Sequence, residues 1–128
     1  MIVVDASAVL EVLVGEPNES LVTRLAREDV LHAPHLLDTE VLHVLRRLEH
    51  RRQLTEDQVA LGRTRFDELT IDRYPHRPLS ERVWALRPAL SAYDATYVAL
   101  AEALDATLVT TDHRLAGANG TSTAIEVH

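Results

Sequence analysis

Short apolar runs rich in β-branched residues alternate with longer amphipathic stretches, and this alternation constrains the fold more than any other feature. The runs predict strands at 2–4, 30–33, 71–74, 107–110 and 124–127. The stretches between them predict helices at 6–14, 17–28, 36–52, 55–69, 80–86 and 93–104, with a helical turn at 112–116. Such alternation predicts an α/β fold, with a mostly parallel sheet and helices on both faces. At 128 residues, near the commonest domain size, we expect one domain over 1–128.

Local signals support several of these helices. Thr55 and Gln58 have the spacing of a capping box at the start of a helix, and Pro17 suits the first turn of another. The stretch 36–52 has the strongest helical pattern, because its apolar side chains repeat along one face: Leu37, Val41, Val44, Leu45 and Leu48. Trp84, the only tryptophan, is expected in the core rather than at an interface.

The composition excludes several kinds of chemistry. The chain has no cysteine, which excludes disulfides, thiolate nucleophiles and cysteine-bound zinc or iron–sulfur sites. All 13 basic residues are arginines, which excludes Schiff-base lysines and the lysine of a phosphate-binding P-loop. The reactive groups must therefore be oxygen or imidazole.

Hydropathy and charge bear on location and partners. No apolar run approaches the roughly 20 residues that a membrane helix needs, and the first residues lack the pattern of a secretion signal. We therefore expect a cytoplasmic protein without a membrane span. The formal net charge of −7 argues against a nonspecific nucleic-acid binder, because such binding depends on neutralising phosphates. A role on nucleic acid thus requires a local source of positive charge.

Four acidic residues occupy positions from which a carboxylate can enter one crevice. Asp5 and Asp112 each follow a predicted strand, and ligands of open α/β sheets gather beyond the carboxyl ends of the strands. Glu40 lies at the edge of the apolar stripe of its helix, and Asp94 lies in the first turn of its helix on the side of Tyr97. Ordinary structural roles stay open: a helix cap for the two strand-end acids, a snorkelling side chain for Glu40 and a helix-dipole interaction for Asp94.

Together, the four carboxylates favour a divalent metal. Negative charges gathered in one crevice repel one another unless a cation lies between them. Oxygen donors suit Mg²⁺ or Mn²⁺ better than zinc, and pairs of such ions about 4 Å apart catalyse phosphodiester hydrolysis. Bound metal also supplies the positive charge that a nucleic-acid substrate requires. No histidine lies at a strand end or an inward helix position beside the acids, so we expect no histidine to act as general base.

Four blocks of the sequence form a recognisable pattern. They are Ile2-Val3-Val4-Asp5-Ala6-Ser7-Ala8, the helix of Glu40, Ser91-Ala92-Tyr93-Asp94-Ala95-Thr96-Tyr97-Val98-Ala99-Leu100-Ala101, and Leu108-Val109-Thr110-Thr111-Asp112. This pattern resembles the PIN-domain family, specifically the VapC-type ribonuclease toxins of bacterial type II toxin–antitoxin systems. The third block is the most specific, and the resemblance spans essentially the whole chain. It implies a PIN-like three-layer sandwich with a short, mostly parallel sheet.

Carried over residue by residue, the resemblance assigns roles to several side chains. It makes one acidic quartet the catalytic residues and the ligands of Mg²⁺ or Mn²⁺: Asp5, Glu40, Asp94 and Asp112. Ser7 and Thr110 match accessory polar positions, although a helix-start role explains Ser7 equally well; Thr110 shares the strand side of Asp112. Some relatives carry a further acid just after the last aspartate, where this chain has His113 and Arg114, so one or two metal ions stay open.

The resemblance also implies macromolecular partners. VapC-type proteins act as endoribonucleases on RNA, typically form homodimers, and are neutralised by a cognate VapB-like antitoxin that covers the active-site groove. A basic cluster at the end of the Glu40 helix is available for RNA phosphates, although a solvated helix face explains it equally well. Its members are Arg46, Arg47, Arg51 and Arg52.

Other functions fit parts of the pattern. A receiver-like signalling module has a similar length and an Mg²⁺-binding acidic pocket, but it needs a lysine, which this chain lacks. Receivers also usually show a pair of acids after the first strand, where this chain has Asp5 alone. A catalytically inactive PIN-fold binding protein ranks low because all four acids are present. A phosphatase or a DNA-directed nuclease uses the same kind of pocket and stays open.

Overall fold

A parallel β-sheet forms the centre of the molecule. The structure, a computed structural model, describes residues 1–16 and 18–128. Its strands are β1 (Ile2–Val4), β2 (Leu31–Pro34), β3 (Ile71–Tyr74), β4 (Thr107–Thr110) and β5 (Ile125–Val127), in the order β3-β2-β1-β4-β5. Each neighbouring pair is parallel. The strand order reverses between β1 and β4, so ligands are expected beyond the carboxyl ends of these two strands.

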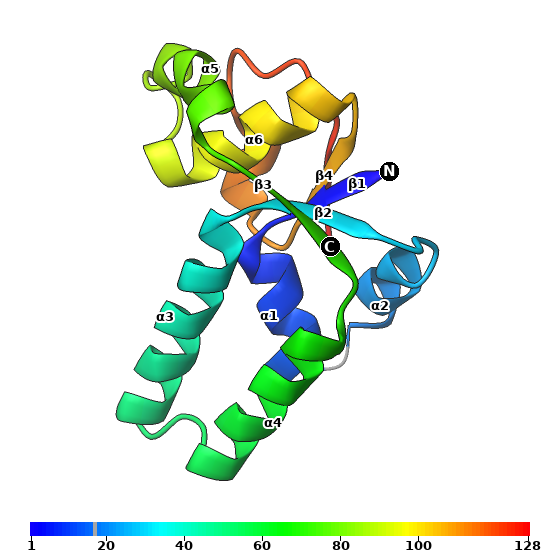
Figure 1. The fold of residues 1–128 in the computed structure, drawn as a ribbon, viewed down its shortest axis with the longest axis vertical. Helices are drawn as coiled ribbons and strands as arrows, with labels where there is room; N and C mark the ends of the chain where they lie inside the picture. Colours follow the sequence, from blue (N-terminus) through cyan, green and yellow to red (C-terminus); the bar gives the residue numbers. More distant parts are fainter. Residues whose placement is uncertain (17) are drawn as a thin grey trace.

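Helices cover both faces of this sheet. They are α1 (Ala6–Val14), α2 (Glu19–Leu25), α3 (Leu36–His50), α4 (Glu56–Glu68), α5 (Ser80–Ala85) and α6 (Ala92–Leu104), with short 3-10 helices η1 (Arg77–Leu79) and η2 (His113–Gly117). In Figure 1, α5 and α6 lie on one side of the sheet, whereas α1, α3 and α4 lie on the other. None of the helices in the described residues combines the length and the apolar character needed to cross a membrane. The predicted three-layer α/β sandwich is confirmed.

Apolar side chains at the expected periods build the core between the layers. The whole of β1 is buried, as is typical of a parallel strand covered on both faces. On α3, the stripe formed by Leu37, Val41 and Leu45 is buried against the rest of the core. On α6, seven consecutive residues from Ala95 to Ala101 are buried, because this helix lies between the sheet and α5. These two helices carry Glu40 and Asp94.

One predicted helix end, the start of α4, agrees with the structure, whereas the predicted range of α2 differs from it. The predicted capping box is present: the backbone N of Gln58 donates to Thr55 Oγ1, and the backbone N of Thr55 donates to Gln58 Oε1. The second helix begins at Glu19, where Asn18 caps it by accepting a hydrogen bond from Leu21 N, and it ends at Leu25, earlier than the predicted end at residue 28. The predicted place of Pro17 in a first helical turn lies outside the described residues.

The predicted core position of Trp84 is wrong. Its side chain is 67% exposed on α5, and the Arg87 guanidinium stacks over its ring, 4.3 Å from the centroid. Leu79 and Leu86, which flank α5, are buried and fill the core at this end of the molecule. A lone aromatic residue carries no periodicity, so the sequence does not show which side of a short helix it takes.

Candidate active site

Four acidic side chains line one small cavity at the carboxyl ends of β1 and β4. Asp5 follows β1 directly, and Asp112 lies two residues beyond the end of β4. Glu40 comes from α3, and Asp94 comes from the first turn of α6. The cavity has a volume of about 120 Å³, and Tyr97 completes its wall beside these acids. The structure thus brings the predicted acidic quartet together.

Asp5 is buried at the base of this cavity, with 7% of its surface exposed. Its Oδ1 accepts hydrogen bonds from Ser7 Oγ at 2.6 Å and from the backbone N of Ala8 at 3.0 Å. Its Oδ2 accepts a hydrogen bond from Thr110 Oγ1 at 2.5 Å. The bond from Ala8 makes Asp5 the N-cap of α1. Asp5 therefore caps a helix and lines the cavity at the same time.

Ser7 and Thr110 connect the ends of β1 and β4 through Asp5. Ser7 Oγ accepts a hydrogen bond from the backbone N of Thr111 at 3.0 Å while it donates to Asp5. Thr110 Oγ1 accepts from the backbone N of Asp112 at 3.0 Å while it also donates to Asp5. Each hydroxyl thus has its proton committed to the carboxylate and a lone pair committed to the backbone. Both predicted accessory residues lie against Asp5, where they fix its orientation.

Burial governs the charge of Asp5. Loss of surrounding water raises its pKa above the ordinary value of 3.8, and the nearby charge of Asp94 acts in the same direction. The hydrogen bonds from Ser7, Thr110 and Ala8 lower the pKa but do not outweigh the burial. A buried carboxylate of this kind carries an unfavourable charge that a cation in the cavity would relieve.

Glu40 and Tyr97 form another part of the wall. Tyr97 is 2% exposed, and its hydroxyl donates a hydrogen bond of 2.6 Å to Glu40 Oε1. Burial raises the pKa of Glu40, and so do the charges of Asp94 and Asp5, whereas the bond from Tyr97 lowers it. Burial and the contact with Glu40 raise the pKa of Tyr97 far above its ordinary range. Tyr97 therefore keeps its proton and holds Glu40 in place as a donor.

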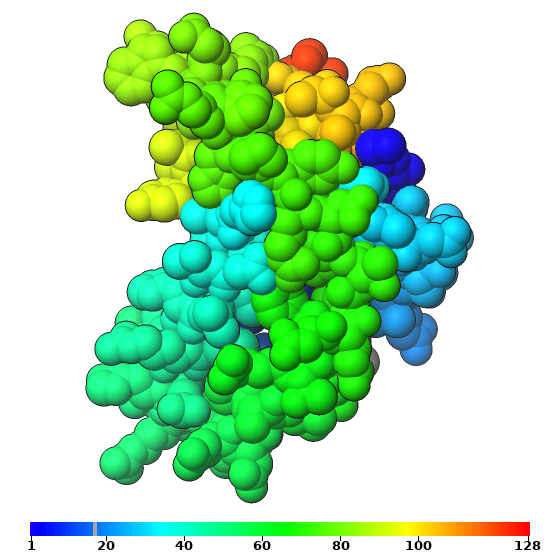
Figure 2. All heavy atoms as spheres, in the orientation of Figure 1, coloured from blue at the N-terminus to red at the C-terminus, as the bar shows by residue number. Residues whose placement is uncertain are grey.

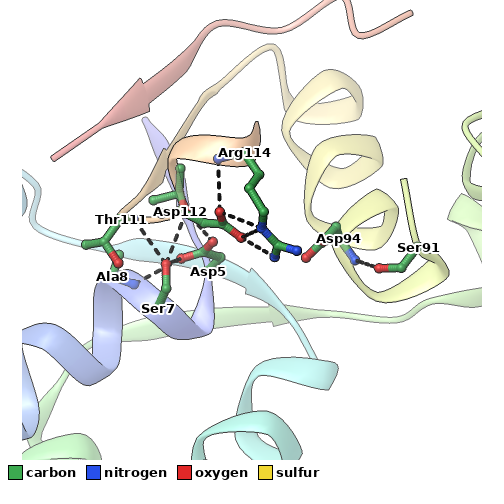
Figure 3. Close-up of polar contacts among 9 residues, drawn as sticks. Asp5, Ser7, Ala8, Ser91, Asp94, Thr111, Asp112 and Arg114 are labelled. Carbon is green, nitrogen blue, oxygen red and sulfur yellow. Dashed lines mark hydrogen bonds and ion pairs between the residues drawn. The ribbon is translucent and has the colours of Figure 1, made fainter. Parts of the chain in front are cut away.

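Asp112 lies at the rim of the cavity and is paired with an arginine. Arg114 donates from Nε to Oδ1 at 3.0 Å and from Nη2 to Oδ2 at 2.5 Å, and these bonds lower the pKa of Asp112. Figure 3 shows the guanidinium between Asp112 and Asp94. The backbone N of Asp94 donates to Ser91 Oγ, which caps α6. Arg114 thus brings a positive charge to the open side of the cavity.

Comparison with known proteins identifies the family to which this architecture belongs. The sequence profile of the family described as PIN domain matches residues 2–120. The chain belongs to the PIN-domain family. All four acids that line the cavity fall within the matched residues.

Similar proteins place this PIN domain among the VapC-type members. Ribonuclease VapC1 of Mycobacterium tuberculosis is 47% identical over 120 residues, which cover 92% of this chain and 90% of the relative. Ribonuclease VapC9 of the same organism is 47% identical over 115 residues, covering 90% and 88%. The crystal structure of VapBC2 from Rickettsia felis, bound to a DNA fragment from their promoter, matches with a TM-score of 0.71 at 15% identity and covers 100% of this chain and 99% of its own. The expected resemblance to VapC-type ribonucleases is confirmed.

The oxygen atoms of this PIN domain suit a hard divalent cation, although they are not closed around one. In residues 1–16 and 18–128, no three acidic or imidazole side chains are already arranged to share one ion. Two of the acids have partners of their own, since Tyr97 donates to Glu40 and Arg114 donates to Asp112. Carboxylates are nevertheless the donors that Mg²⁺ and Mn²⁺ prefer. The donor set therefore fits such an ion, provided that Asp112 exchanges Arg114 for it.

The predicted basic cluster is only partly near the cavity. Its four arginines are all exposed, on the last turns of α3 and just beyond it. Arg47 lines a groove that also includes Glu40, whereas Arg46, Arg51 and Arg52 line neither this groove nor the acidic cavity.

Two residues of the site were missed by sequence reasoning. The sequence does indicate that Tyr97 lies beside Asp94, because it follows Asp94 by three residues and so shares its side of the helix. Its bond to Glu40 depends on the fold, because Glu40 lies on a different helix. No signal in the sequence indicates the ion pair of Arg114 with Asp112.

Proposed function

We propose that this chain is a metal-dependent endoribonuclease that hydrolyses RNA phosphodiester bonds. The supporting observation is the cavity in which four acids meet at the carboxyl ends of β1 and β4. We further propose that these acids are the catalytic residues and hold Mg²⁺ or Mn²⁺: Asp5, Glu40, Asp94 and Asp112. The relatives VapC1 and VapC9 are ribonucleases by name, which supports RNA as the substrate.

Each side chain of the cavity has a part in this proposal. When bound, the ion supplies an activated water and stabilises the charge that develops on the phosphate. Ser7 and Thr110 keep Asp5 in a single orientation, and Tyr97 keeps Glu40 directed at the cavity. Arg114, whose side chain is 81% exposed, moves from Asp112 to the incoming phosphate.

We also propose that the protein is the toxin of a bacterial toxin–antitoxin pair. In this proposal it acts in the cytoplasm on RNA, as a homodimer, and a cognate VapB-like antitoxin neutralises it. Support comes from the fold similarity to VapBC2 of Rickettsia felis, which is bound to a DNA fragment from their promoter. The arginines at the end of α3 are available for RNA phosphates, as proposed from the sequence.

Metal removal tests the proposed reaction. The purified chain is incubated with total RNA, and the new ends are sequenced. EDTA is expected to abolish cleavage, and added Mg²⁺ or Mn²⁺ is expected to restore it, because the acids need the ion to approach a phosphate. The Asp5→Asn variant should be inactive with either ion. Undiminished cleavage in a rigorously metal-free preparation would contradict the mechanism.

Two further arms of this experiment separate the alternatives. Double-stranded DNA and a phosphomonoester are offered in place of RNA, and hydrolysis of either one in the absence of RNA cleavage would replace the ribonuclease proposal. In cells, induction of the wild-type chain should arrest growth, whereas induction of Asp5→Asn should not. A small protein from the same operon should copurify with the chain and relieve the arrest. Harmless induction without such a partner would remove the toxin proposal.

A further inference from the structure

A second and larger hollow adjoins the acidic cavity. Its volume is about 500 Å³, which is in the range of sites that hold small organic ligands. Glu40 lines both hollows, so this side chain lies between them. In Figure 2, the yellow residues at the start of α6 stand beside the cyan residues at the start of α3. We call this hollow the α3–α6 groove.

One face of α3 forms the long wall of the groove. Glu40, His43, Val44 and Arg47 all line it, and their spacing of three and four residues places them on one side of the helix. Moving along α3 away from the acids, this wall changes from a carboxylate to an imidazole and then to a guanidinium. Arg46, the neighbour of Arg47, does not line the groove. The groove therefore leads from the acidic cavity to a positive charge.

Tyr93 lines the groove from α6. Its side chain is 63% exposed, although most large apolar and aromatic residues of the chain are buried. It immediately precedes Asp94, which lies in the acidic cavity. Within residues 1–16 and 18–128, no stacking contact involves its ring. An aromatic ring is thus presented to solvent at the edge of the groove, beside the acids.

We infer that the α3–α6 groove binds a single-stranded nucleotide next to the scissile phosphate, with its base stacked on Tyr93 and a phosphate paired with Arg47. This inference rests on the proposed ribonuclease function and adds a substrate class to it. Base stacking requires an unpaired base with an accessible face, and single-stranded RNA offers this whereas a duplex hides it. The positive end of the groove explains how a chain of net charge −7 tracks a phosphate backbone.

Binding of a short RNA separates stacking from general charge attraction. The probe is a fluorescein-labelled single-stranded RNA octamer, titrated in Mg²⁺ into the Asp5→Asn chain and followed by anisotropy. Removing the ring with Tyr93→Ala should weaken binding about 5- to 150-fold, since a stacked base contributes about 1–3 kcal/mol. Tyr93→Phe should bind as tightly as the parent. Trp84→Ala, which removes another exposed aromatic outside the groove, should leave binding unchanged.

Two further measurements distinguish the loss of base stacking from a disturbance of the neighbouring Asp94 in Tyr93→Ala. An octamer that carries 2-aminopurine should lose fluorescence on binding to the parent and to Tyr93→Phe, but not to Tyr93→Ala. Arg47→Ala should reduce the slope of log affinity against log salt by about one, because one phosphate contact is lost. Arg63→Ala, which removes an exposed arginine of α4 that lines neither hollow, is the matched control and should leave the slope unchanged. The same sequence as a duplex should bind more weakly and respond to none of the Tyr93 variants.

Several outcomes would overturn the inference. The inference would be wrong if Trp84→Ala and Tyr93→Ala lost the same amount of affinity for the octamer. It would also be wrong if the single strand and the duplex bound equally tightly. A change of oligomeric state in Tyr93→Ala, measured by light scattering, would assign the groove to a second copy of the chain. The proposed nuclease activity fails separately: if RNA binding depends on Tyr93 but the wild-type chain cleaves no RNA, the groove assignment stands and the activity falls.

Discussion

Asp5 and Asp112 line the same cavity, yet their surroundings differ in almost every respect. Asp5 is buried and accepts three hydrogen bonds from neutral groups of its own chain. Asp112 is at the rim and is paired with the exposed guanidinium of Arg114. Burial raises the pKa of Asp5, whereas the arginine lowers the pKa of Asp112. The inner wall is thus fixed by neutral donors, and the rim is held by an exchangeable charge.

This difference means that the protein's own groups compensate the charges of the two acids unequally. Neutral hydroxyls orient the carboxylate of Asp5 but do not neutralise its negative charge. A cation would therefore still interact favourably with Asp5. At the rim, the guanidinium of Arg114 compensates the charge of Asp112 and lies near Asp94 (Figure 3). An exposed ion pair of this type contributes about 0–1 kcal/mol to stability. In the proposed metal complex, the ion therefore replaces Arg114 at Asp112 at little energetic cost.

The largest expected effect comes from Asp94→Asn, which removes a charge between the inner wall and the rim. The loss of a proposed ligand should reduce RNA cleavage by about 10²–10³-fold. In EDTA the variant should melt about 2–4 °C higher than the wild type, because the charge of Asp94 disfavours ionised Asp5 and Glu40. Mg²⁺ should stabilise the wild type more than the variant, since the ion binds the native state. Thermal melts with EDTA and with Mg²⁺ measure both.

An Asp94→Asn chain that is less stable in EDTA, and that responds to Mg²⁺ as the wild type does, would make Asp94 a helix-terminal residue alone. Loss of the favourable interaction with the α6 dipole costs about 0.3–1 kcal/mol and works against the predicted gain. The four-carboxylate metal site would then have to be redrawn. Ser91→Ala, which removes the cap of α6 but no charge, is the control for helix stability.

A smaller effect is expected from Thr110→Val, which disturbs the inner wall without changing its charge. The hydroxyl of Thr110 donates to Asp5 and accepts from the backbone N of Asp112, so its removal leaves the buried Asp5 Oδ2 and the partly buried N of Asp112 without this partner. The cost should be about 1–3 kcal/mol of folding stability. Metal affinity should fall about 10- to 100-fold, as is typical when a partner of a metal ligand is lost. Titration calorimetry with Mn²⁺ measures the affinity.

Thr107→Val is the matched control for this variant, because Thr107 lies on the same strand at the end remote from the cavity. It should keep the wild-type Mn²⁺ affinity. If Thr110→Val kept it too, the orientation of Asp5 would be set by α1 alone, and the contrast between a fixed wall and an exchangeable rim would lose its physical basis.

The smallest effects should appear in the pH dependence of stability, with opposite signs for the two acids. The pKa of Asp5 is raised, so the metal-free native state binds its proton more tightly than the unfolded state does. Wild-type stability in EDTA should therefore fall as pH rises from about 4 through that raised pKa, and Asp5→Asn should lack this fall. The pKa of Asp112 is lowered, so its contribution is present above 3.8 and is lost as pH falls through the lowered value.

Melting temperatures in EDTA between pH 3 and pH 8 provide the comparison. The difference between Asp5→Asn and the wild type should grow with rising pH, by about 2–4 °C. Asp112→Asn should melt below the wild type at neutral pH and approach it in acid, with a smaller change because its ion pair is exposed. Curves of the same sign for both variants would show that the two acids share one environment.

Much of the fold and the acidic quartet could be predicted from the sequence because each depends on local patterns. An apolar run that ends in Asp5 predicts both a buried strand and a carboxylate at its end. Glu40 is marked by its place on the edge of an apolar stripe, and Asp94 by its place in a first helical turn. Parallel strands then bring their carboxyl ends to one edge, so the meeting of the acids follows from topology.

The remaining features depend on contacts between distant segments. Tyr97 reaches Glu40 across 57 residues, and no period in the sequence reports such a pair. Trp84 is exposed and not in the core, because hydrophobicity alone does not determine which side of α5 faces the core. Arg47 differs from Arg46 only in its direction from α3, which decides whether it lines the groove. In each case the missing information is three-dimensional.

The bond between Thr110 and Asp5 joins residues that are 105 positions apart in the chain. Translation adds about 5–20 residues per second, so a nascent chain carries Asp5 for roughly 5–20 seconds before Thr110 exists. During this interval β1 lacks β4, the strand that pairs with one of its edges, and Asp112 has not been made. An interrupted or truncated translation product therefore has no complete acidic cavity. The cavity with its four acids can therefore form only after the ribosome has added Asp112 to the chain.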